Sequence, residues 1–232
     1  MYKNFTFREW DSHFFNKAIF SFELTSNDIS NVGWPSNSLI TTKISSNNYQ
    51  NLDKANNYDF TFVEGEIVFQ KKLRENAAPV SLVDLDSYLA TESSIDELKS
   101  IVKNLYLNSR FREPWFSSIE RDNFYQIWIE NAVLSKFDDC CLVLKNEGAI
   151  SGFVTLRIRG SEAVIGLIGV ANRFQGRGVG SKLLKLIEAY CVANNVSNIK
   201  VATQTSNVFA ANLYSKNGFS IADISYWFYK QV

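Results

Sequence analysis

A glycine-rich run, Gln175-Gly176-Arg177-Gly178-Val179-Gly180, has the residue types and spacing that most clearly suggest chemistry. It follows an apolar run that ends at Val170 and precedes a predicted helix that begins at Ser181. Glycine lacks the Cβ that would block approach to the backbone, and a helix N-terminus presents unpaired N–H groups at the positive end of its dipole. Such a turn can bind a pyrophosphate. The alternative interpretation is an ordinary loop that needs positive φ angles.

The spacing and the composition narrow the chemistry further. The pattern Q-x-x-G-x-G differs from the G-x-G-x-x-G of dinucleotide-binding turns, and the run lacks the Gly-Lys-Ser/Thr of a Walker loop. The chain has one histidine, His13, which disfavours His-rich and Cys/His metal sites, so we expect no metal. His13 lies among aromatic residues, and we expect it to be packed or hydrogen-bonded rather than a base. The reacting groups must then be mostly tyrosines, carboxylates, amides or a bound cofactor.

Charge and cysteine content bound the partners and the compartment. The 232 residues carry 24 Lys+Arg against 24 Asp+Glu, a balance that disfavours a nucleic-acid partner. Cysteines are found at 140, 141 and 191, an odd number with no disulfide spacing, which favours free thiols in a reducing compartment. No apolar run approaches the about 20 residues of a membrane helix, and the N-terminal residues do not resemble a signal peptide. We expect a cytoplasmic protein without a membrane partner.

The elements that must position the glycine-rich run follow an α+β pattern. From residue 86 onward the order is strand, two helices, three antiparallel strands, helix, strand, helix and strand. Ser94 and Glu97 match a capping box at the start of the first helix. The remaining elements are predicted at 121–134, 140–145, 152–159, 163–170, 181–195, 199–205, 207–217 and 219–230.

Two domains are predicted, with a junction within residues 71–85 that contains Asn-Ala-Ala-Pro. A small N-terminal α/β domain would cover 1–75, and the second domain would cover 86–232. Residues 40–69 and 200–229 both indicate strand, Ser-Asn, helix, Asn plus aromatic, strand. This similarity is either an internal repeat or a chance likeness of composition.

The run VANRFQGRGVGSKLL resembles motif A of the GNAT acetyltransferases, and TSNVFAANLYSKNGF at 205–219 is similar to the motif that follows it. The resemblance implies the GNAT fold for 86–232, a mixed and mostly antiparallel sheet flanked by helices, and acetyl-CoA as co-substrate. Strand 163–170 would splay from its neighbour, with Arg173, Arg177 and Lys182 as the nearest cations for the CoA phosphates. The implied cofactor-binding residues are Ile168, Gly169, Val170, Gln175, Gly176, Arg177, Gly178, Val179, Gly180, Ser181 and Asn207.

A narrower resemblance, to the TDP-fucosamine acetyltransferases, covers nearly the full length. It is carried by FVEGEIVF at 62–69, SRFREPWF at 109–116, FYQIWIENAV at 124–133, VATQT at 201–205 and YWFYK at 226–230. The resemblance implies acetyl transfer to the amine of TDP-4-amino-4,6-dideoxygalactose for a surface polysaccharide such as enterobacterial common antigen. Two departures are the longer loop before Gly178 and Leu213, which stands where a cation is expected to bind a CoA phosphate.

The same resemblance assigns roles in the reaction. Tyr214 matches the general acid, and a phenol with an unperturbed pKa near ~10 is protonated at neutral pH. Glu64 is the candidate base that removes the amine proton, and Glu66 competes with it by the period-2 rule. Each has a plainer interpretation: a packed tyrosine, or an exposed glutamate on a strand. Asn207 is either a CoA contact or a helix cap.

The acceptor would be bound by Arg110, Arg112, Trp115, Phe124 and Tyr125, since a nucleotide-sugar needs cations for its diphosphate and an aromatic face for its base. The alternative is that Trp115 or Phe116 belongs to the core. Other functions stay open, namely acetylation of another amine and a non-catalytic acyl-CoA-binding module. The sequence leaves undecided whether the sugar is 3- or 4-amino and galacto or gluco. Strand edges at 226–230 leave a homodimer possible.

Overall fold

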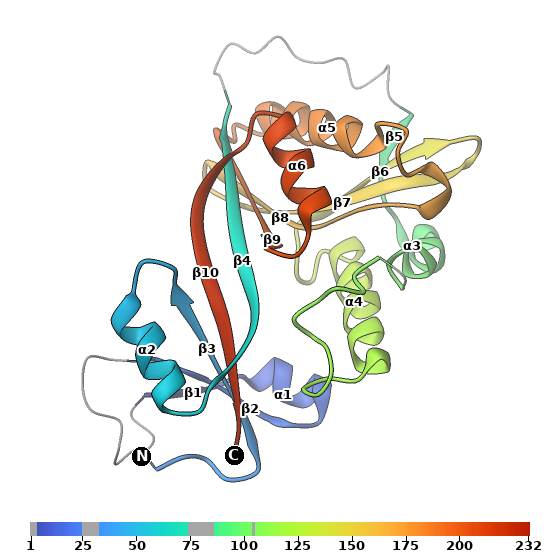
Figure 1. Cartoon of the computed structure of the whole chain (residues 1–232). Coiled ribbons are helices and arrows are strands. Elements are labelled where there is room, and N and C mark those ends of the chain that lie inside the picture. Colours follow the sequence, from blue (N-terminus) through green and yellow to red (C-terminus); the bar gives the residue numbers. More distant parts are fainter. Residues whose placement is uncertain (1–3, 25–32, 74–85, 104) are drawn as a thin grey trace. The chain divides into compact units, whose positions relative to one another are not determined.

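The computed structural model describes residues 4–24, 33–73, 86–103 and 105–232 (Figure 1). The chain divides into two compact units. Unit one comprises Met1–Ile67, Gln204–Ser206 and Asp223–Val232, and unit two comprises Val68–Thr203 and Asn207–Ala222. Each unit is described by itself.

Unit one is a sheet with two short helices. Its elements are β1 (Phe5–Phe7), α1 (Glu9–Phe15), β2 (Ala18–Phe22), β3 (Ser38–Ser45), α2 (Tyr49–Asn57), the first part of β4 (Thr61–Lys72) and the last part of β10 (Ser220–Gln231). The strand order is β1-β2-β3-β10-β4, in which β2 and β3 are parallel and β3 and β10 are antiparallel. Its core is aromatic and aliphatic, and it includes Phe22, Ile40, Ile44, Ala55, Phe60 and Phe228.

Unit two contains the rest of β4 and β10 and the elements predicted after residue 86. They are β5 (Ser87–Leu89), a 3₁₀ turn (Glu92–Ser94), α3 (Ile95–Val102), α4 (Ser118–Val133), β6 (Cys140–Asn146), β7 (Ala149–Arg159), β8 (Glu162–Val170), a 3₁₀ turn (Asn172–Phe174), α5 (Val179–Ala193), β9 (Asn198–Gln204) and α6 (Val208–Lys216). The order β4-β9-β8-β7-β6-β5 contains the predicted antiparallel meander β6-β7-β8 and the parallel pair β8-β9. The predicted α+β architecture with a mixed sheet is confirmed.

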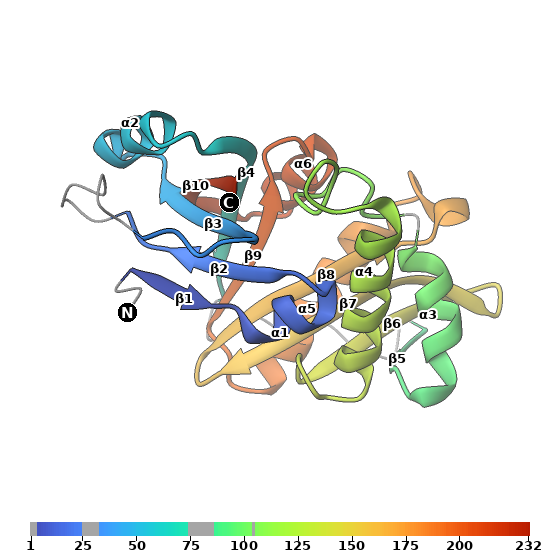
Figure 2. The same cartoon turned by 90° about the horizontal axis from the view of Figure 1, so that it is seen from below.

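Helices cover both faces of this sheet (Figure 2). A Cβ on Gly152 of β7 would meet Val179 and Leu183 of α5, at 3.0 and 2.9 Å. A Cβ on Gly169 of β8, opposite Phe153, would meet Leu105 at 2.5 Å, in the segment that follows α3. Because neighbouring residues of a strand point to opposite faces, α5 and the segment at Leu105 lie on opposite sides of the sheet.

The capping box predicted at Ser94 and Glu97 is wrong. Ser94 closes a 3₁₀ turn with helical backbone angles and makes no cap hydrogen bond, and Glu97 instead accepts a hydrogen bond from the Ile150 amide at 2.8 Å. The capping box lies at α4, where Ser117 has an extended backbone. There the Glu120 amide donates to the Ser117 hydroxyl at 3.3 Å, and the Ser117 amide donates to the Glu120 carboxylate at 2.7 Å. The motif needs an extended N-cap, which Ser94 lacks.

The division into units differs from the predicted domains at three places: unit two begins at Val68, and unit one also contains Gln204–Ser206 and Asp223–Val232. Residues 74–85, most of the predicted junction, lie outside the described residues. The last part of β10 lies in unit one, where Ser225–Gln231 pairs with Leu39–Ser45 of β3. The two segments predicted as a repeat do share their architecture, since both form strand, helix and strand.

Three further features concern the sequence predictions. His13 is exposed near the end of α1, so it is not packed, whereas the expectation that it is not a base stays a prediction. Cys141 and Cys191 are buried thiols, and Cys140 is a half-buried one. Among the described residues, no helix is both long and apolar enough to cross a membrane.

Candidate active site

Strands β8 and β9 separate at the point where the predicted site begins. Their parallel pairing runs from Glu162 opposite Asn198 to Ile165 opposite Val201 and ends there. β8 nevertheless continues to Val170, and on its other side it stays paired with β7 as far as Gly152. The predicted splay of strand 163–170 is therefore present. Within the described part of the chain, the last part of β8 has no strand partner on the β9 side, and backbone groups on such an edge can bind an extended ligand.

The glycine-rich run forms the turn between β8 and α5. Gly176 and Gly178 have φ angles of 72° and 77°, in the left-handed region, and a Cβ on either would meet nothing within 4 Å. The helix begins at Val179 with no side-chain cap on its first N–H groups. The turn therefore presents open space and uncapped amides together, which is the arrangement that an anion needs.

Two neighbouring side chains shape this turn. Gln175 donates hydrogen bonds to the Val170 carbonyl at 3.3 Å and to the Asn172 side chain at 3.1 Å, so it ties the turn to the end of β8. A Cβ on Gly180 would lie 3.0 Å from Leu213 of α6. Leu213, which stands where a cation was expected, thus packs α6 against the start of α5.

Cations flank the turn. The guanidinium groups of Arg173 and Arg177 lie 4.6 and 5.9 Å from the ring centre of Phe174, which is buried. Both arginines are exposed, as is Lys182. The stacking on Phe174 limits where the two guanidinium groups can lie and keeps positive charge beside the uncapped amides.

Tyr214 is buried on α6, with only 2% of its surface exposed. Its ring lies against Phe69 and Phe219, at centroid distances of 5.4 and 5.9 Å. Burial raises the pKa of the Tyr214 hydroxyl well above its ordinary value, because a phenolate would lose its hydration. Tyr214 is therefore protonated at neutral pH and has a proton to give.

Asn207, seven residues earlier, is the N-cap of α6. Its Oδ1 accepts a hydrogen bond from the Ala210 amide at 3.1 Å. The cap that the sequence offered as the plain alternative is thus present. It uses the side-chain oxygen, and the Nδ2 amide is the group that could also contact a ligand.

Tyr106 was not singled out in the sequence, and it joins the site to β8. Its hydroxyl donates to the Ile168 carbonyl at 3.1 Å, and its ring stacks on Tyr125 at 4.3 Å. Its pKa is raised, first by burial and then by the nearby Tyr125 and Tyr214 hydroxyls. Tyr106 therefore contacts both Tyr125 and Ile168. The position of Tyr106 just after a helix carried no signal that distinguishes it from a core aromatic residue.

Comparison with known proteins shows the family of the chain. Residues 104–219 match the model of the acetyltransferase (GNAT) family. The chain is 34% identical, over 83% of its own length and 82% of the relative's, to dTDP-fucosamine acetyltransferase of Escherichia coli O6:H1. The chain belongs to the GNAT family. It is therefore an acetyl-CoA-dependent N-acetyltransferase, as the sequence predicted.

Solved structures agree on the GNAT fold. A conserved protein of unknown function from Staphylococcus epidermidis matches 94% of this chain and 86% of its own, with a TM-score of 0.63 at 16% identity. A PaiA N-acetyltransferase from Thermoplasma acidophilum, solved with coenzyme A, matches 64% of this chain and 99% of its own, with a TM-score of 0.51 at 15% identity.

The residues predicted to bind the acceptor of this GNAT enzyme lie around the start of α4. Tyr125 is buried, and its hydroxyl shares a 2.7 Å hydrogen bond with Ser109. Phe124 is also buried and packs on Phe111 at 4.4 Å. Trp115 is half-buried and Phe116 is buried, so the core alternative holds for Phe116.

The two predicted acceptor arginines differ in their surroundings. The guanidinium of Arg110 lies 4.2 Å from the ring centre of Phe111. Arg112 is exposed, and one of its guanidinium nitrogens donates to the Glu113 carbonyl at 2.9 Å.

The candidate bases of the GNAT reaction, Glu64 and Glu66, lie on β4 in unit one. The Glu64 carboxylate accepts hydrogen bonds from the Gly65 amide and the Thr205 hydroxyl, both at 2.9 Å, and from the Ser206 hydroxyl at 2.7 Å. Glu66 accepts from Lys43 at 2.5 Å and from the Trp227 indole at 3.0 Å. Glu66 is thus paired with a cation, whereas the Gly65, Thr205 and Ser206 groups that donate to Glu64 are neutral.

Proposed function

We propose that this enzyme transfers the acetyl group of acetyl-CoA to the amino group of a TDP-amino-dideoxy-sugar, TDP-4-amino-4,6-dideoxygalactose, for a surface polysaccharide. The observation that carries the proposal is the 34% identity to dTDP-fucosamine acetyltransferase, which extends over 82% of that protein, well beyond the glycine-rich turn. Acetyl-CoA and nucleotide-sugars are cytoplasmic metabolites, so we place the reaction in the cytoplasm.

Acetyl-CoA would bind along β8 and the turn that follows it. The backbone groups of Ile168, Gly169 and Val170 would hydrogen-bond the pantetheine arm, since this part of β8 has no strand partner on the β9 side among the described residues. Side chains already donate to two of its carbonyls, Tyr106 to Ile168 and Gln175 to Val170. The uncapped amides from Val179 to Ser181 would bind the pyrophosphate, with Gly176 and Gly178 giving it access. Arg173, Arg177 and Lys182 would neutralise the phosphates. Asn207 would donate from Nδ2.

The reaction would proceed by direct attack of the neutral amine on the thioester carbonyl. The C–N bond forms as the carbonyl becomes an oxyanion, which a β8 amide would stabilise. The C–S bond then breaks, and Tyr214 gives its proton to the departing thiolate. The raised pKa of Tyr214 keeps the phenol protonated before this step, and the phenolate formed by it would afterwards regain a proton.

Removal of the amine proton is assigned to Glu64. Its donors are neutral, whereas Glu66 is paired with Lys43. Arg110 and Arg112 would bind the diphosphate of the acceptor, Trp115 would stack on the thymine, and Tyr125 would line the sugar pocket next to Tyr106.

A thiol-release assay with acetyl-CoA and a panel of amines tests the proposal. The panel contains TDP-linked 4-amino and 3-amino sugars of galacto and gluco configuration, the corresponding UDP-sugars, a polyamine and a peptide with a free N-terminus. We expect the highest kcat/KM for TDP-4-amino-4,6-dideoxygalactose, with the acetyl group found on nitrogen by mass spectrometry. Higher kcat/KM for the polyamine or the peptide would contradict the sugar assignment.

Calorimetric titration with acetyl-CoA tests the remaining alternative, a non-catalytic acyl-CoA-binding module. Acetyl-CoA that binds but is not turned over with any amine of the panel would favour the non-catalytic acyl-CoA-binding module. Acetyl-CoA that does not bind at all would contradict the cofactor assignment itself.

A further inference from the structure

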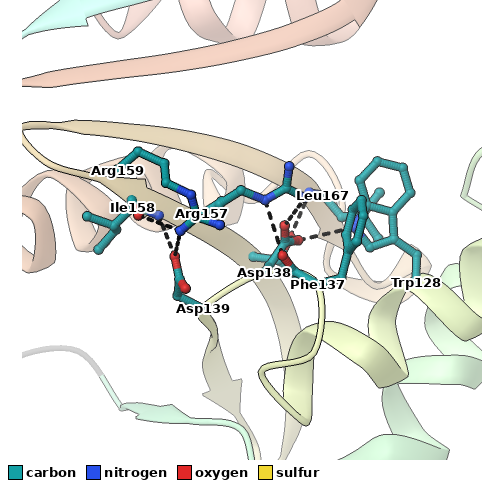
Figure 3. Close-up of polar contacts among 9 residues, drawn as sticks. Trp128, Phe137, Asp138, Asp139, Arg157, Ile158, Arg159 and Leu167 are labelled. Atoms are coloured by element: carbon teal, nitrogen blue, oxygen red, sulfur yellow. Dashed lines mark hydrogen bonds and ion pairs between the residues drawn. The ribbon is translucent and has the colours of Figure 1, made fainter.

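Asp138 is a buried carboxylate that the proposed reaction does not use. Only 1% of its surface is exposed, and it lies just before β6 (Figure 3). Three donors meet it: the Trp128 indole at 3.1 Å, the Thr155 hydroxyl at 2.6 Å and the Arg157 guanidinium at 3.0 Å. A charge buried in this way is costly unless it is paired and hydrogen-bonded, as it is here.

The Thr155 hydroxyl transmits this arrangement to β8. It donates to Asp138, and it accepts a hydrogen bond from the Leu167 amide at 2.8 Å. Because the carboxylate can only accept, it fixes the direction of the Thr155 proton and turns a hydroxyl lone pair toward Leu167. Asp138 thereby determines the partner of a backbone amide on another strand.

This contact coincides with a bulge between β7 and β8. Val154 lies opposite Ile168 and Leu156 opposite Ile165, so Gly166 and Leu167 together face the single residue Thr155. The glycine is required, because a Cβ on Gly166 would lie 2.4 Å from the Asp138 carboxylate and 2.8 Å from the Thr155 hydroxyl. The side chain of Asp138 therefore approaches the backbone of β8 directly at the bulge.

The bulge also marks the place where β8 leaves β9. Ile165 is the last residue of β8 paired with β9, and Ile168 is the first residue expected to contact acetyl-CoA. The two bulged residues are those that connect them. Contacts that fix the backbone of Gly166 and Leu167 therefore also fix the position and orientation of the Ile168–Val170 backbone.

Arg157 forms an ion pair with the Asp138 carboxylate and holds it in place. Its Nε donates to the Phe137 carbonyl at 3.1 Å, and its guanidinium stacks on the Phe137 ring at 4.2 Å. The Arg157 guanidinium is thus fixed by Phe137 as well as by Asp138, and it stays next to the Asp138 carboxylate.

We propose that Asp138 is a positioning residue for acetyl-CoA, which acts through the Thr155 hydroxyl to set the bulge of β8 and so the alignment of Ile168–Val170. The proposal rests on the proposed function in that acetyl-CoA is taken to bind this edge. It does not depend on the identity of the acceptor.

Two substitutions of Thr155 test the proposal by calorimetric titration with acetyl-CoA alone. Thr155→Val keeps the shape but leaves the Leu167 amide without its acceptor and removes one of the three donors to the Asp138 carboxylate, so we expect Kd to rise about 10-fold or more. Thr155→Ser retains the hydroxyl and should keep Kd within about threefold of the native value. In the thiol-release assay, Thr155→Val should raise KM for acetyl-CoA and leave KM for the amine nearly unchanged.

A neighbouring pair supplies the matched control. Asp138→Asn replaces one carboxylate oxygen by an NH₂ group, which is a donor and cannot accept hydrogen bonds from the groups that surround Asp138. The substitution should raise Kd for acetyl-CoA about 10-fold. Asp139→Asn alters the next residue, an exposed carboxylate that accepts from the Ile158 amide at 2.6 Å and pairs with Arg159 (Figure 3), and should leave Kd unchanged.

The outcomes separate positioning from simple stability. Unchanged Kd in folded Thr155→Val, with only a lower Tm, would overturn the proposal, and so would an equal rise in Kd for Asp139→Asn. If Thr155→Val does not fold, the comparison of Asp138→Asn with Asp139→Asn decides by the same criterion. A failure of the sugar assay with normal acetyl-CoA binding would count against the proposed acceptor and not against this inference.

Discussion

Two segments of the chain have the same local architecture, and only one of them carries the proposed acid. β3-α2-β4 of residues 38–72 and β9-α6-β10 of residues 198–231 are both strand, helix and strand. Asn48 caps α2 with φ −94° and ψ 71°, and Asn207 caps α6 with φ −87° and ψ 69°. Each cap oxygen accepts from the amide three residues later at 3.1 Å.

The ends of the two helices match as well. Eleven residues after each cap the backbone is left-handed, at Asp59 with φ 59° and at Gly218 with φ 81°. A buried phenylalanine follows in both, Phe60 and Phe219, and then the strand begins. The internal repeat suggested by the sequence is thus present in the backbone, down to the caps and turns.

The difference lies seven residues after each cap. α2 has Ala55, which is wholly buried in the core of unit one, and α6 has Tyr214, which is buried against Phe69 and Phe219. The same backbone arrangement therefore carries a core alanine in one segment and the proposed proton donor in the other. The comparison teaches that the backbone supplies the position, while the chemistry depends on one side chain.

Exchanging these two side chains should give the largest effect. Tyr214→Ala removes a buried aromatic ring, so we expect a loss of about 3–5 kcal/mol in the free energy of unfolding, together with loss of turnover. Ala55→Tyr forces a ring into a packed core and should cost more than the about 1–3 kcal/mol of ordinary overpacking. Chemical denaturation monitored by circular dichroism measures both.

Exposed residues in the first turn of each helix provide the controls for this exchange. Phe209 of α6 is 92% exposed and Tyr49 of α2 is 73% exposed. Substitution of either by alanine should change the free energy of unfolding by no more than about 0.5 kcal/mol. Equal losses of unfolding free energy in the control and the exchange variants would show that the two helices do not differ specifically at Ala55 and Tyr214.

The two caps should be equal in stability and unequal in function. Asn48→Ala and Asn207→Ala should each lower the free energy of unfolding by about 1 kcal/mol, because each leaves one helix amide without its acceptor. Only Asn207→Ala should weaken acetyl-CoA binding in a calorimetric titration. Asn207→Ser sharpens the test, since serine keeps the cap but lacks the Nδ2 donor. Normal affinity in Asn207→Ser would remove Asn207 from the cofactor site.

The left-handed turns should give the smallest effect. A Cβ on Gly218 would have only the flexible end of Lys71 within 4 Å, at 3.7 Å, so Gly218→Ala tests backbone conformation alone and should cost about 1 kcal/mol. Asp59→Gly should stay within about 0.5 kcal/mol of the native value, since relief at φ 59° is offset by the greater freedom of glycine in the unfolded chain. Thermal unfolding measures both changes in stability. A larger loss for Asp59→Gly than for Gly218→Ala would show that the two turns are not equivalent.

Local patterns in the sequence predicted much of this structure, and contacts between distant residues account for what they missed. The meander, the glycine-rich turn and the position of Tyr214 on its helix depend on periodicity and short motifs. Two Ser-x-x-Glu patterns occur, and only Ser117 has the extended backbone that a capping box needs. The pairing of β10 with β3 joins residues nearly two hundred positions apart, which no local pattern records.

The site shows the same limit. Tyr106 reaches the Ile168 carbonyl across 62 positions, and Asp138 reaches β8 only through a hydroxyl on β7. Neither residue has a distinctive neighbour in the sequence. The catalytic and binding roles stay predictions for all the site residues, those of Tyr214 and Asn207 as well as those of Glu64, the acceptor residues and the residues of the glycine-rich turn.

The turnover of Tyr214→Phe tests the central claim most directly. The substitution removes one oxygen and keeps the ring against Phe69 and Phe219. With acetyl-CoA and the TDP-amino-sugar at saturation, we predict that kcat falls at least about 100-fold, while Kd for acetyl-CoA and Tm stay close to native values. A kcat within about threefold of the native value would contradict the assignment of Tyr214 as the general acid, the role that is proposed to distinguish β9-α6-β10 from β3-α2-β4.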